Sequence, residues 1–334
     1  MKAHKLQIAA AILVVAGLLG ATQAAGTAFA TARHANVAAN KSHTTKLTVG
    51  LLRIADAGGY WVATYRGFFA KHHLRVAETT DSGGATLIPA IESGANQVGF
   101  SNLVSVLQAA TKHLGMECLA GTLKKPAVGH ELSLLVSPKD ASSIKDAKDL
   151  EGKTVAVNTL DNINQLLAED YMATHGATYK SVHFVAMTFP DMPSALVKGT
   201  IDAAITDEPA TTLAIKTGAK VLSARPYQTI TKEPVFSCWL AKTTWVDSHK
   251  LAAREFVAAL EEADSYIAKH PHYLRSILPK YAKLPAAIAN VITMPIITTQ
   301  ITAAILTKWE KVALRFGMLK HDVKVKSLIA HLGS

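Results

Sequence analysis

The sequence of 334 residues is 49% hydrophobic and 18% charged, with a formal net charge of +10 at pH 7. These proportions are typical of a globular protein, and the length is sufficient for two hydrophobic cores. The basic excess is dispersed, and its densest group, in residues 308–326, alternates with apolar residues as on a solvated helix face. Because nucleic-acid-binding surfaces interleave basic residues with stacking aromatics, the composition argues against that class of partner.

The N-terminus has the three parts of an export signal. Lys2 and Lys5 form a basic start, residues 8–20 are an apolar run too short to span a bilayer, and Ala28-Phe29-Ala30 offers a small-residue cleavage site. We predict a signal peptide over residues 1–30 in preference to a buried N-terminal helix. Because no cysteine lies near the cleavage site, we expect a periplasmic or extracellular protein without a lipid anchor.

The chain after the predicted signal alternates between short apolar runs and amphipathic stretches. Residues 31–45 show no periodicity and are predicted to be a flexible leader. The alternation that follows is typical of strands separated by helices. Strands are predicted at 46–55, 74–80, 98–100, 118–123 and 131–137, and helices at 61–71, 87–92 and 104–110.

The same alternation continues from Thr154 to about Ser223. Residues 234–246 are then predicted to form a strand that leads back, and everything beyond His249 is predicted to be helical. Two apolar stripes at helical spacing support the helical prediction. One lies in 301–316, and the other consists of Leu251, Phe256, Val257, Leu260, Ala263 and Ile267.

Two stretches share one order of features: a proline, a short apolar helix, a glycine stop, a short strand and a polar end. They are residues 88–105 and 189–212, and Gly94 aligns with Gly199 at an offset of 105 residues. At that offset Asn102 falls on Asp207. The offset is too long for a solenoid repeat and indicates two lobes of similar construction.

The pattern predicts an α/β fold in which each lobe has a mostly parallel sheet flanked by helices. The helices after His249 must cover a sheet, and the first lobe has too few helices of its own. We therefore predict lobe I at residues 46–135 together with 235–334, and lobe II at residues 136–234. Two strands that cross between lobes at one place form a hinge.

The sequence has two cysteines, Cys118 and Cys238, each in a strand-like run near a predicted crossover. An oxidising compartment permits a disulfide between them. The bond also requires a Cα separation below about 7 Å, which a sequence does not supply. A disulfide and two free thiols are therefore both open.

Four segments resemble one family: "GGATLIPAIESGANQVGFSN", "DLEGKTVAVNT", "FPDMPSALVKGTIDAAITDEP" and "RFGMLKHDVKV". They are similar to the exported solute-binding proteins of ABC importers for nitrate, sulfonates, taurine and thiamine pyrimidine precursors. The resemblance implies the type II periplasmic binding protein fold, in which two lobes close on a small-molecule ligand. It also implies an ABC transporter permease as partner, a monomeric state, and no cofactor or metal.

Five loops are expected at the ligand cleft: "DAGGYW", "DSGGAT", "GFSN", "NTLDN" and "TDEP". In open α/β sheets, ligands bind beyond the carboxyl ends of the strands, where helix N-termini offer free backbone N–H groups. The predicted ligand-binding residues are Gly59, Tyr60, Trp61, Ser82, Gly83, Gly84, Ser101, Asn102, Asn158, Thr159, Asn162, Asp207 and Glu208.

Each of these residues also has a purely structural interpretation. The glycine pairs are compatible with simple turns, and Asn158, Thr159, Asn162, Ser101 and Asn102 with helix N-caps. Tyr60 is favoured over Trp61 as a stacking surface because Trp61 begins an apolar stripe. Asp207 and Glu208 precede a helix, so capping and a favourable dipole interaction compete with a ligand or interlobe contact.

Catalytic motifs are absent from the sequence. "GFSNL" lacks the second glycine of the serine-hydrolase elbow, and no C-x-x-C or H-E-x-x-H occurs. The histidine pairs 72–73 and 270/272 have no third zinc ligand nearby. We predict a non-enzymatic solute-binding protein. An exported hydrolase or lyase on the same fold is the alternative from another class.

The acidic balance of the five loops bears on the ligand. They contain no Lys or Arg, whereas Asp56, Asp81, Asp161, Asp207 and Glu208 lie in or beside them. A small anion buried without a fixed cation is costly. We therefore predict that an organic ligand (an amino-sulfonate, an alkanesulfonate or a pyrimidine-like molecule) binds more tightly than nitrate or bicarbonate. A nitrate- or bicarbonate-binding importer component is the alternative.

Overall fold

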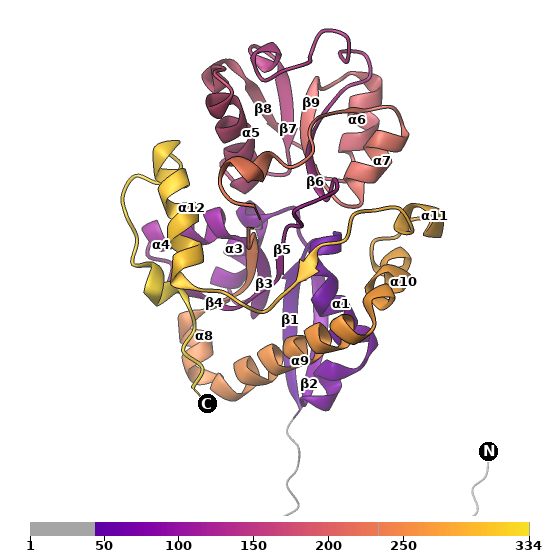
Figure 1. Cartoon of the computed structure of the whole chain (residues 1–334). Helices are drawn as coiled ribbons and strands as arrows, with labels where there is room; N and C mark the ends of the chain where they lie inside the picture. Colours follow the sequence, from indigo (N-terminus) through magenta and orange to yellow (C-terminus); the bar gives the residue numbers. More distant parts are fainter. Residues whose placement is uncertain (1–43, 233, 334) are drawn as a thin grey trace, which may run out of the picture. The chain divides into compact units, whose positions relative to one another are not determined.

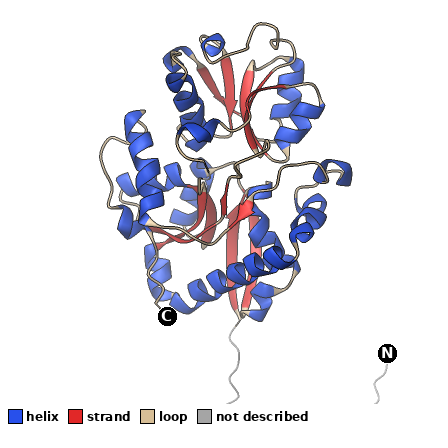
Figure 2. Cartoon of the chain, viewed as in Figure 1, coloured by secondary structure: helices blue, strands red, loops and turns tan. Residues whose placement is uncertain are grey.

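Two five-stranded sheets organise the chain (Figure 1). The computed structural model describes residues 44–232 and 234–333, which form one compact unit. The predicted signal peptide and nearly all of the predicted leader lie outside the described residues. Helices flank both sheets, as Figure 2 shows. In the described part of the chain, no helix combines the length and the apolarity needed to cross a bilayer.

The first sheet has the strand order β2-β1-β3-β11-β4. Strand β1 runs parallel to β2 and β3, whereas β11 runs antiparallel to β3 and to β4. Four strands therefore share one direction and β11 is reversed. The strands are β1 (Thr45–Leu51), β2 (Leu74–Thr80), β3 (Val98–Asn102), β4 (Met116–Gly121) and β11 (Ser237–Lys242).

The second sheet repeats this plan with the order β8-β7-β9-β6-β10. Strand β7 runs parallel to β8 and β9, and the reversed strand is β6, which pairs antiparallel with β9 and β10. The strands are β6 (Leu132–Val136), β7 (Thr154–Val157), β8 (His183–Ala186), β9 (Ala203–Asp207) and β10 (Lys220–Ser223). In each sheet, the reversed strand is the one that the chain supplies on crossing from the other sheet.

We call the part built on the first sheet lobe I and the part built on the second sheet lobe II. Lobe I also holds a small ribbon of β5 (Leu123–Lys124) and β12 (Ile296–Ile297). Its helices are α1 (Gly58–Tyr65), α2 (Phe68–Lys71), α3 (Gly84–Glu92), α4 (Leu103–Thr111), α8 (Thr243–Ser248), α9 (Lys250–Lys269), α10 (Pro271–Tyr281), α11 (Ala286–Ala289) and α12 (Ala303–Arg315). Those of lobe II are α5 (Ile163–Thr174), α6 (Met192–Lys198) and α7 (Ala210–Lys216).

The C-terminal helices cover the first sheet, as the sequence indicated. Helix α9 packs against α1 and α2, and α12 packs against α4 (Figure 1). The stripe on α9 buries Phe256, Leu260 and Ala263, but Leu251 is 68% exposed because it lies in the first turn of α9, on the side away from the sheet. The burial of one face explains why this long helix forms although its opposite face is charged.

Three predictions of secondary structure were wrong in detail. The helix predicted at 61–71 is divided into α1 and α2 because Gly67 adopts a left-handed conformation, with φ of 73°. The strand predicted to run to residue 246 ends at Lys242, and the chain continues as α8. The region beyond His249 is not wholly helical, because β12 and the extended segment after Gly317 interrupt it.

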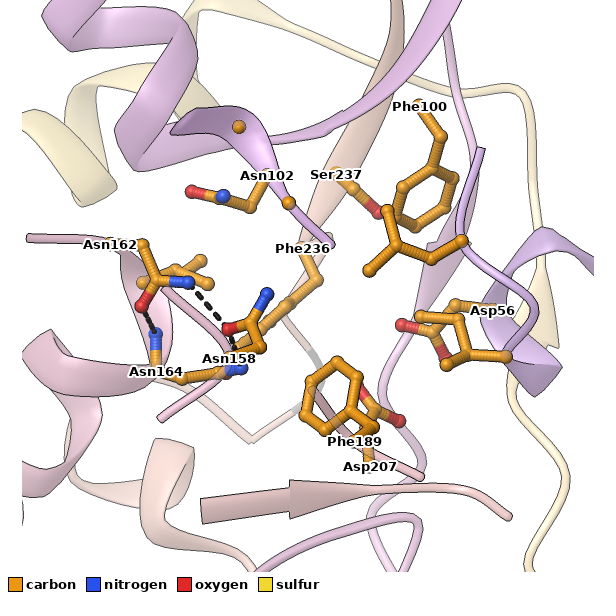
Figure 3. A pocket seen from close by; sticks show the side chains of 15 residues that line it. Asp56, Phe100, Asn102, Asn158, Asn162, Asn164, Phe189, Asp207, Phe236 and Ser237 are labelled. Atoms are coloured by element: carbon orange, nitrogen blue, oxygen red, sulfur yellow. Dashed lines mark hydrogen bonds between the residues drawn. The ribbon is translucent and has the colours of Figure 1, made fainter. Parts of the chain in front are cut away.

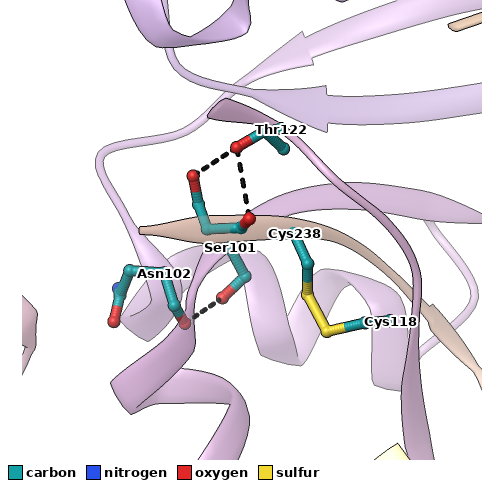
Figure 4. Close-up of a disulfide and its surroundings, with 6 residues drawn as sticks. Ser101, Asn102, Cys118, Thr122 and Cys238 are labelled. Carbon is teal, nitrogen blue, oxygen red and sulfur yellow. Dashed lines mark hydrogen bonds between the residues drawn. A yellow bond between two sulfur atoms is a disulfide. The ribbon is translucent and has the colours of Figure 1, made fainter. Parts of the chain in front are cut away.

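Cys118 and Cys238 form a disulfide, which settles the question that the sequence left open (Figure 4). They lie on the adjacent strands β4 and β11, and their Cα atoms are 5.7 Å apart. The bond thus ties the outermost strand of lobe I to the reversed strand, inside the hydrophobic core.

Candidate ligand-binding site

A small pocket lies where the carboxyl ends of strands from both sheets meet (Figure 3). Its volume is about 30 Å³, which is room for no more than a few water molecules. The lining residues are Leu52, Ile54, Asp56, Gly83, Gly84, Phe100, Asn102, Asn158, Asn162, Ile163, Asn164, Phe189, Asp207, Phe236 and Ser237. Both lobes contribute, and the lining residues lie at strand ends, in the loops beside them and in the first residues of α3 and α5.

The lobe II side of the pocket is a network of three asparagines. Asn162 caps α5, because its Oδ1 accepts hydrogen bonds from the backbone N–H groups of Asn164 and Gln165 at 3.0 and 3.2 Å. The Oδ1 atom of Asn158 accepts bonds from the side-chain amides of Asn162 and Asn164. Asn158 Nδ2 donates to the carbonyl of Ser82 in lobe I at 2.9 Å. The network therefore both caps a helix and joins the lobes.

The lobe I side depends on Gly83, Gly84 and Asn102. A Cβ atom on Gly84 would lie 2.3 Å from Ser105 Oγ, and one on Gly83 would lie 2.8 Å from Asn158 Nδ2. These glycines are required for close approach, of α4 in one case and of lobe II in the other. Asn102 caps α4, since its Oδ1 accepts from the backbone N–H of Ser105 at 3.0 Å.

A buried lysine that the sequence analysis missed lies at the hinge end of the pocket. Lys125 follows β5, and its side chain is fully buried. Its Nζ atom lies 2.8 Å from Asp56 Oδ2, 2.9 Å from Glu131 Oε1 and 2.9 Å from Asp207 Oδ2. We call these four residues the Lys125 cluster. Asp56 comes from lobe I, Asp207 from lobe II and Glu131 from the crossover between them.

The Lys125 cluster has the spacing of a metal site but already contains a cation. The carboxylate oxygens of Asp56, Glu131 and Asp207 lie within 4.8 Å of one another, and Lys125 Nζ is bonded to each residue. An ammonium has three N–H donors, so these three contacts use all of them.

Burial and mutual repulsion set the protonation of the Lys125 cluster. Burial opposes the charge on Lys125, but the surrounding carboxylates outweigh it and raise the pKa of the ammonium. Burial, followed by repulsion from Asp56, raises the pKa of Asp207 to about 7. Burial and the neighbouring Asp207 likewise raise the pKa of Glu131. Lys125 therefore stays protonated, and Glu131 and Asp207 bind protons at a higher pH than exposed carboxyl groups do.

Of the two acidic residues before α7, Glu208 is the one that bonds to the first turn of the helix. Its buried carboxylate accepts from the backbone N–H and the hydroxyl of Thr212 in α7, at 3.1 and 2.7 Å. It also accepts from the backbone N–H of Thr293 in lobe I at 3.1 Å. Burial raises the pKa of Glu208 to about 7. Asp207 pairs with Lys125 instead, so each residue of the acidic pair makes an interlobe contact.

Further contacts between the lobes lie around the pocket. Gln108 on α4 donates to the carbonyl of Asp161 in lobe II at 2.8 Å. Arg315, the last residue of α12, forms an ion pair with Asp170 of α5, whose carboxylate is buried. With the Asn158 and Glu208 bonds, these contacts hold the lobes together in the arrangement that encloses the pocket.

Several predicted site residues lie away from the pocket. Tyr60 is fully buried in lobe I, with its ring 5.5 Å from that of Trp239. Trp61 is also buried and stacks on Tyr281, and Gly59 lies against Ile297. The rings that line the pocket are others, which the sequence analysis did not single out: Phe100, Phe189 and Phe236.

The remaining predicted residues lie beside the pocket without lining it. Ser82 offers its backbone carbonyl to Asn158, and the Thr159 side chain packs where Gly83 approaches. Ser101 is buried and its hydroxyl donates to the carbonyl of Asn102. Figure 3 shows the lining residues grouped at the strand ends, with Asn102, Asn158, Asn162 and Asp207 among them.

A family model described as NMT1/THI5 like matches residues 55–273, well over half of the chain. The chain belongs to the NMT1/THI5-like family. The resemblance noted in the sequence is thereby confirmed. A search of curated proteins finds no match for this NMT1/THI5-like protein.

Solved structures show the same fold. The alkanesulfonate-binding protein SsuA from Xanthomonas axonopodis pv. citri, bound to MOPS, is 15% identical with a TM-score of 0.71, covering 85% of this chain and 98% of that chain. The periplasmic nitrate-binding protein NrtA from Synechocystis PCC 6803 is 15% identical with a TM-score of 0.71, covering 86% of each chain. The desulfurization enzyme DSZB is 14% identical with a TM-score of 0.62, covering 85% of this chain and 96% of that chain. These likenesses confirm the two-lobed α/β fold, which binding proteins and an enzyme share.

Proposed function

We propose that this NMT1/THI5-like protein is the extracytoplasmic solute-binding component of an ABC importer. It is exported without a lipid anchor, captures a small polar organic molecule between its lobes, and delivers that molecule to a membrane permease. It acts as a monomer, without a cofactor and without catalysis. The observation that carries the proposal is the pocket enclosed by the strand ends of both lobes.

Lobe motion follows from the size of the pocket. A volume of about 30 Å³ does not admit an organic molecule from solvent while the lobes stay together. The two crossing segments, which lead into β6 and β11, are the only strand connections between the sheets in the described residues. Rotation about such paired connections opens the cleft, and the interlobe bonds of Asn158, Gln108 and Arg315 re-form on closing.

The lining supports an organic ligand over a bare inorganic anion. Six side chains are apolar, and Lys, Arg and His are absent from the described lining residues. The apolar six are Leu52, Ile54, Phe100, Ile163, Phe189 and Phe236. Nitrate or bicarbonate would bury its charge against these walls and beside two carboxylates, which is unfavourable. An amino-sulfonate, alkanesulfonate or pyrimidine-like molecule has an apolar part that the walls accept.

A thermal-shift screen of the purified protein tests the proposal. The screen covers nitrate, bicarbonate, alkanesulfonates, taurine, pyrimidines and aromatic acids, and calorimetry follows each hit. A ligand at one hundred times its Kd adds about 2.7 kcal/mol of stability, and the same ligand should reduce the radius of gyration in solution scattering.

Two results would overturn the proposed function. One is scattering that does not change at saturating ligand, which contradicts capture by lobe closure. The other is chemical conversion of the best ligand by the purified protein. Conversion would favour the enzymatic alternative. The fold is compatible with that alternative, because the desulfurization enzyme DSZB shares it.

A further inference from the structure

The unpartnered polar atoms of the pocket are all acceptors. Asp56 Oδ1 and Asn164 Oδ1 have no hydrogen-bond partner. Both atoms are buried, and their residues are only 2% and 3% exposed. Both residues line the pocket. No buried side-chain donor without a partner occurs among the described residues that line it. A buried acceptor left unpaired is costly, so these two atoms mark where a ligand supplies donors.

The orientation of Asn164 follows from its neighbours. The carbonyl of Ser82 is only an acceptor, so Asn158 must present its amide nitrogen there, at 2.9 Å. Its Oδ1 therefore faces Asn164, which must present its own nitrogen, at 2.8 Å. Asn164 Oδ1 is consequently the atom left over. The backbone carbonyl of Ser82 in lobe I thus determines, through Asn158, that Asn164 in lobe II presents its oxygen as a free acceptor at the pocket.

The charges in the pocket point the same way. Lys125 donates to Asp56, Glu131 and Asp207, so it has no N–H left for a ligand. It does not line the pocket, whereas Asp56 and Asp207 do. Three carboxyl groups have six oxygens around one ammonium, so acceptors outnumber donors even where burial keeps a proton on Glu131 or Asp207. An anionic ligand group would face this excess with only backbone N–H groups at helix N-termini, such as those of α3 and α5, to oppose it.

One aromatic wall already lies beside a cation. Lys125 Nζ lies 5.0 Å from the centroid of the Phe236 ring, a cation–π distance, and Phe236 lines the pocket. Phe100 and Phe189 are the other two rings that line the pocket together with Asp56 (Figure 3). Rings of this kind accept the flat or apolar part adjoining a cationic head.

We propose that the pocket recognises a cationic hydrogen-bond donor, a protonated amine or an amidine-type group, carried on an organic ligand. Asp56 Oδ1 in lobe I and Asn164 Oδ1 in lobe II accept its N–H groups. Because the two acceptors come from different lobes, a head with several N–H groups satisfies both only when the lobes close. This inference rests on the proposed function and narrows it, since it favours amine-bearing ligands over alkanesulfonates that lack an amine.

Matched pairs of probes separate charge from shape. Guanidinium and nitrate are both planar and trigonal, and acetamidinium and acetate share one heavy-atom skeleton. Within each pair, the cation offers N–H donors and the anion offers oxygen acceptors, while the shape stays nearly the same. Calorimetry with the full-length protein, at probe concentrations up to 20 mM, should show each cation binding at least tenfold more tightly than its anion. Equal or tighter binding of the anions, or binding by none of the four probes, would overturn the proposal.

Variants locate the binding. Asp56→Asn and Asn164→Leu should each weaken acetamidinium binding at least tenfold, whereas Asp322→Asn, at an exposed carboxylate outside the pocket, should leave it unchanged. Asn164→Leu lies outside the Lys125 cluster, so it tests the proposal even if Asp56→Asn fails to fold. Full acetamidinium affinity in a folded Asn164→Leu variant would refute the assigned acceptor. Tight binding of an anion with a reduced radius of gyration would refute the cation while leaving the solute-binding function intact.

Discussion

The two lobes share one strand order but differ at the residues that end their third strands. Asn102 ends β3 and Asp207 ends β9, and both line the pocket. Asn102 caps the helix that follows it, whereas Asp207 turns to Lys125 and leaves the capping of α7 to Glu208. A repeated fold thus keeps its topology while its strand ends take different roles.

The lobes also differ in how the reversed strand is held. In lobe I the Cys118–Cys238 disulfide joins β11 to the outermost strand β4. In lobe II the corresponding strands, β6 and β10, have no cysteine, although the pairing shifts register once in each lobe. The covalent tie is in the lobe that contains both termini of the described chain. Lobe II is a single continuous insertion and relies on packing and on the Lys125 cluster.

The largest effect is expected from Lys125→Met, which would break the link between the cleft end of lobe II and the crossover. Removal of one partner from a buried ionic cluster typically costs about 3–5 kcal/mol, because the remaining charges lose their compensation. Three carboxylates would then be buried together without a cation. We expect a corresponding loss in the free energy of unfolding by urea denaturation.

The neighbouring residue provides the control. Lys124 is the last residue of β5 and lies immediately before Lys125. It is half-buried and forms no ion pair within the described residues. Lys124→Met should change stability by no more than about 0.5 kcal/mol. Equal losses in the two variants would show that the ion pairs of Lys125 are not the source of its contribution to stability.

The disulfide should be the next largest contribution, and it should act on lobe I. Its cysteines are 120 residues apart, and disulfides typically stabilise by about 2–4 kcal/mol through their constraint on the unfolded chain. The double variant Cys118→Ala/Cys238→Ala should lose stability in this range. Hydrogen exchange should rise more in β4 and β11 than in β6 and β10. Uniform changes in both lobes would contradict the comparison.

The fold was predictable because its signals are local and repeated. The offset between Gly94 and Gly199 reflects two helix stops at equivalent places, and both glycines have the left-handed conformation that such stops require. The return of the chain to the first lobe was inferred from helices that needed a sheet to cover; in the structure, β11 pairs in the first sheet and α9 packs against α1 and α2. These inferences rest on hydrophobic periodicity, which the sequence displays directly.

The site was predictable only in part, because burial and partners are tertiary properties. Asn102, Asn158 and Asp207 were placed at the pocket by their position after strands. Lys125 gave no signal, since its sequence, "TLKKPAVGHE", has the appearance of an exposed loop. Its burial depends on pairing with Asp56 and Asp207, which are distant in sequence, and with Glu131, which lies beyond the next turn. Tyr60 was misplaced for the opposite reason, because helix α1 turns that ring toward the core of lobe I.

A pH dependence should follow from buried carboxylates, most of which lie in lobe II. Burial raises the pKa of Glu169 and of Glu208 to about 7, and of Asp264 in lobe I to about 7. A carboxyl group whose pKa is higher in the folded than in the unfolded state stabilises the fold at low pH and loses that contribution as pH rises toward the folded value. The Tm should therefore fall by several degrees between pH 5 and pH 7, because these groups lose their protons in the folded state over this range.

Glu169→Gln isolates one of these groups. The glutamine resembles the protonated carboxyl, and Gln165 can still donate to its oxygen as it donates to Glu169 Oε1 at 2.9 Å. The variant should show a shallower decline of Tm with pH than the wild type. Parallel profiles would mean that Glu169 titrates near its usual range and that the asymmetry between the lobes has another origin.

The smallest effect is expected from the residue that distinguishes the lobes most directly. Asn102→Ala removes the N-cap of α4 and should cost about 1 kcal/mol, because the N–H of Ser105 loses its acceptor. Asn102→Asp installs the residue found at the equivalent place in lobe II, and it should keep the cap, since Asp and Asn cap equally well. Urea denaturation of both variants separates the two roles. If Asn102→Asp is as unstable as Asn102→Ala, Asp56 and Asp207 repel the added carboxylate across the pocket. Electrostatic repulsion, and not helix capping, would then explain why β3 ends in Asn and β9 in Asp.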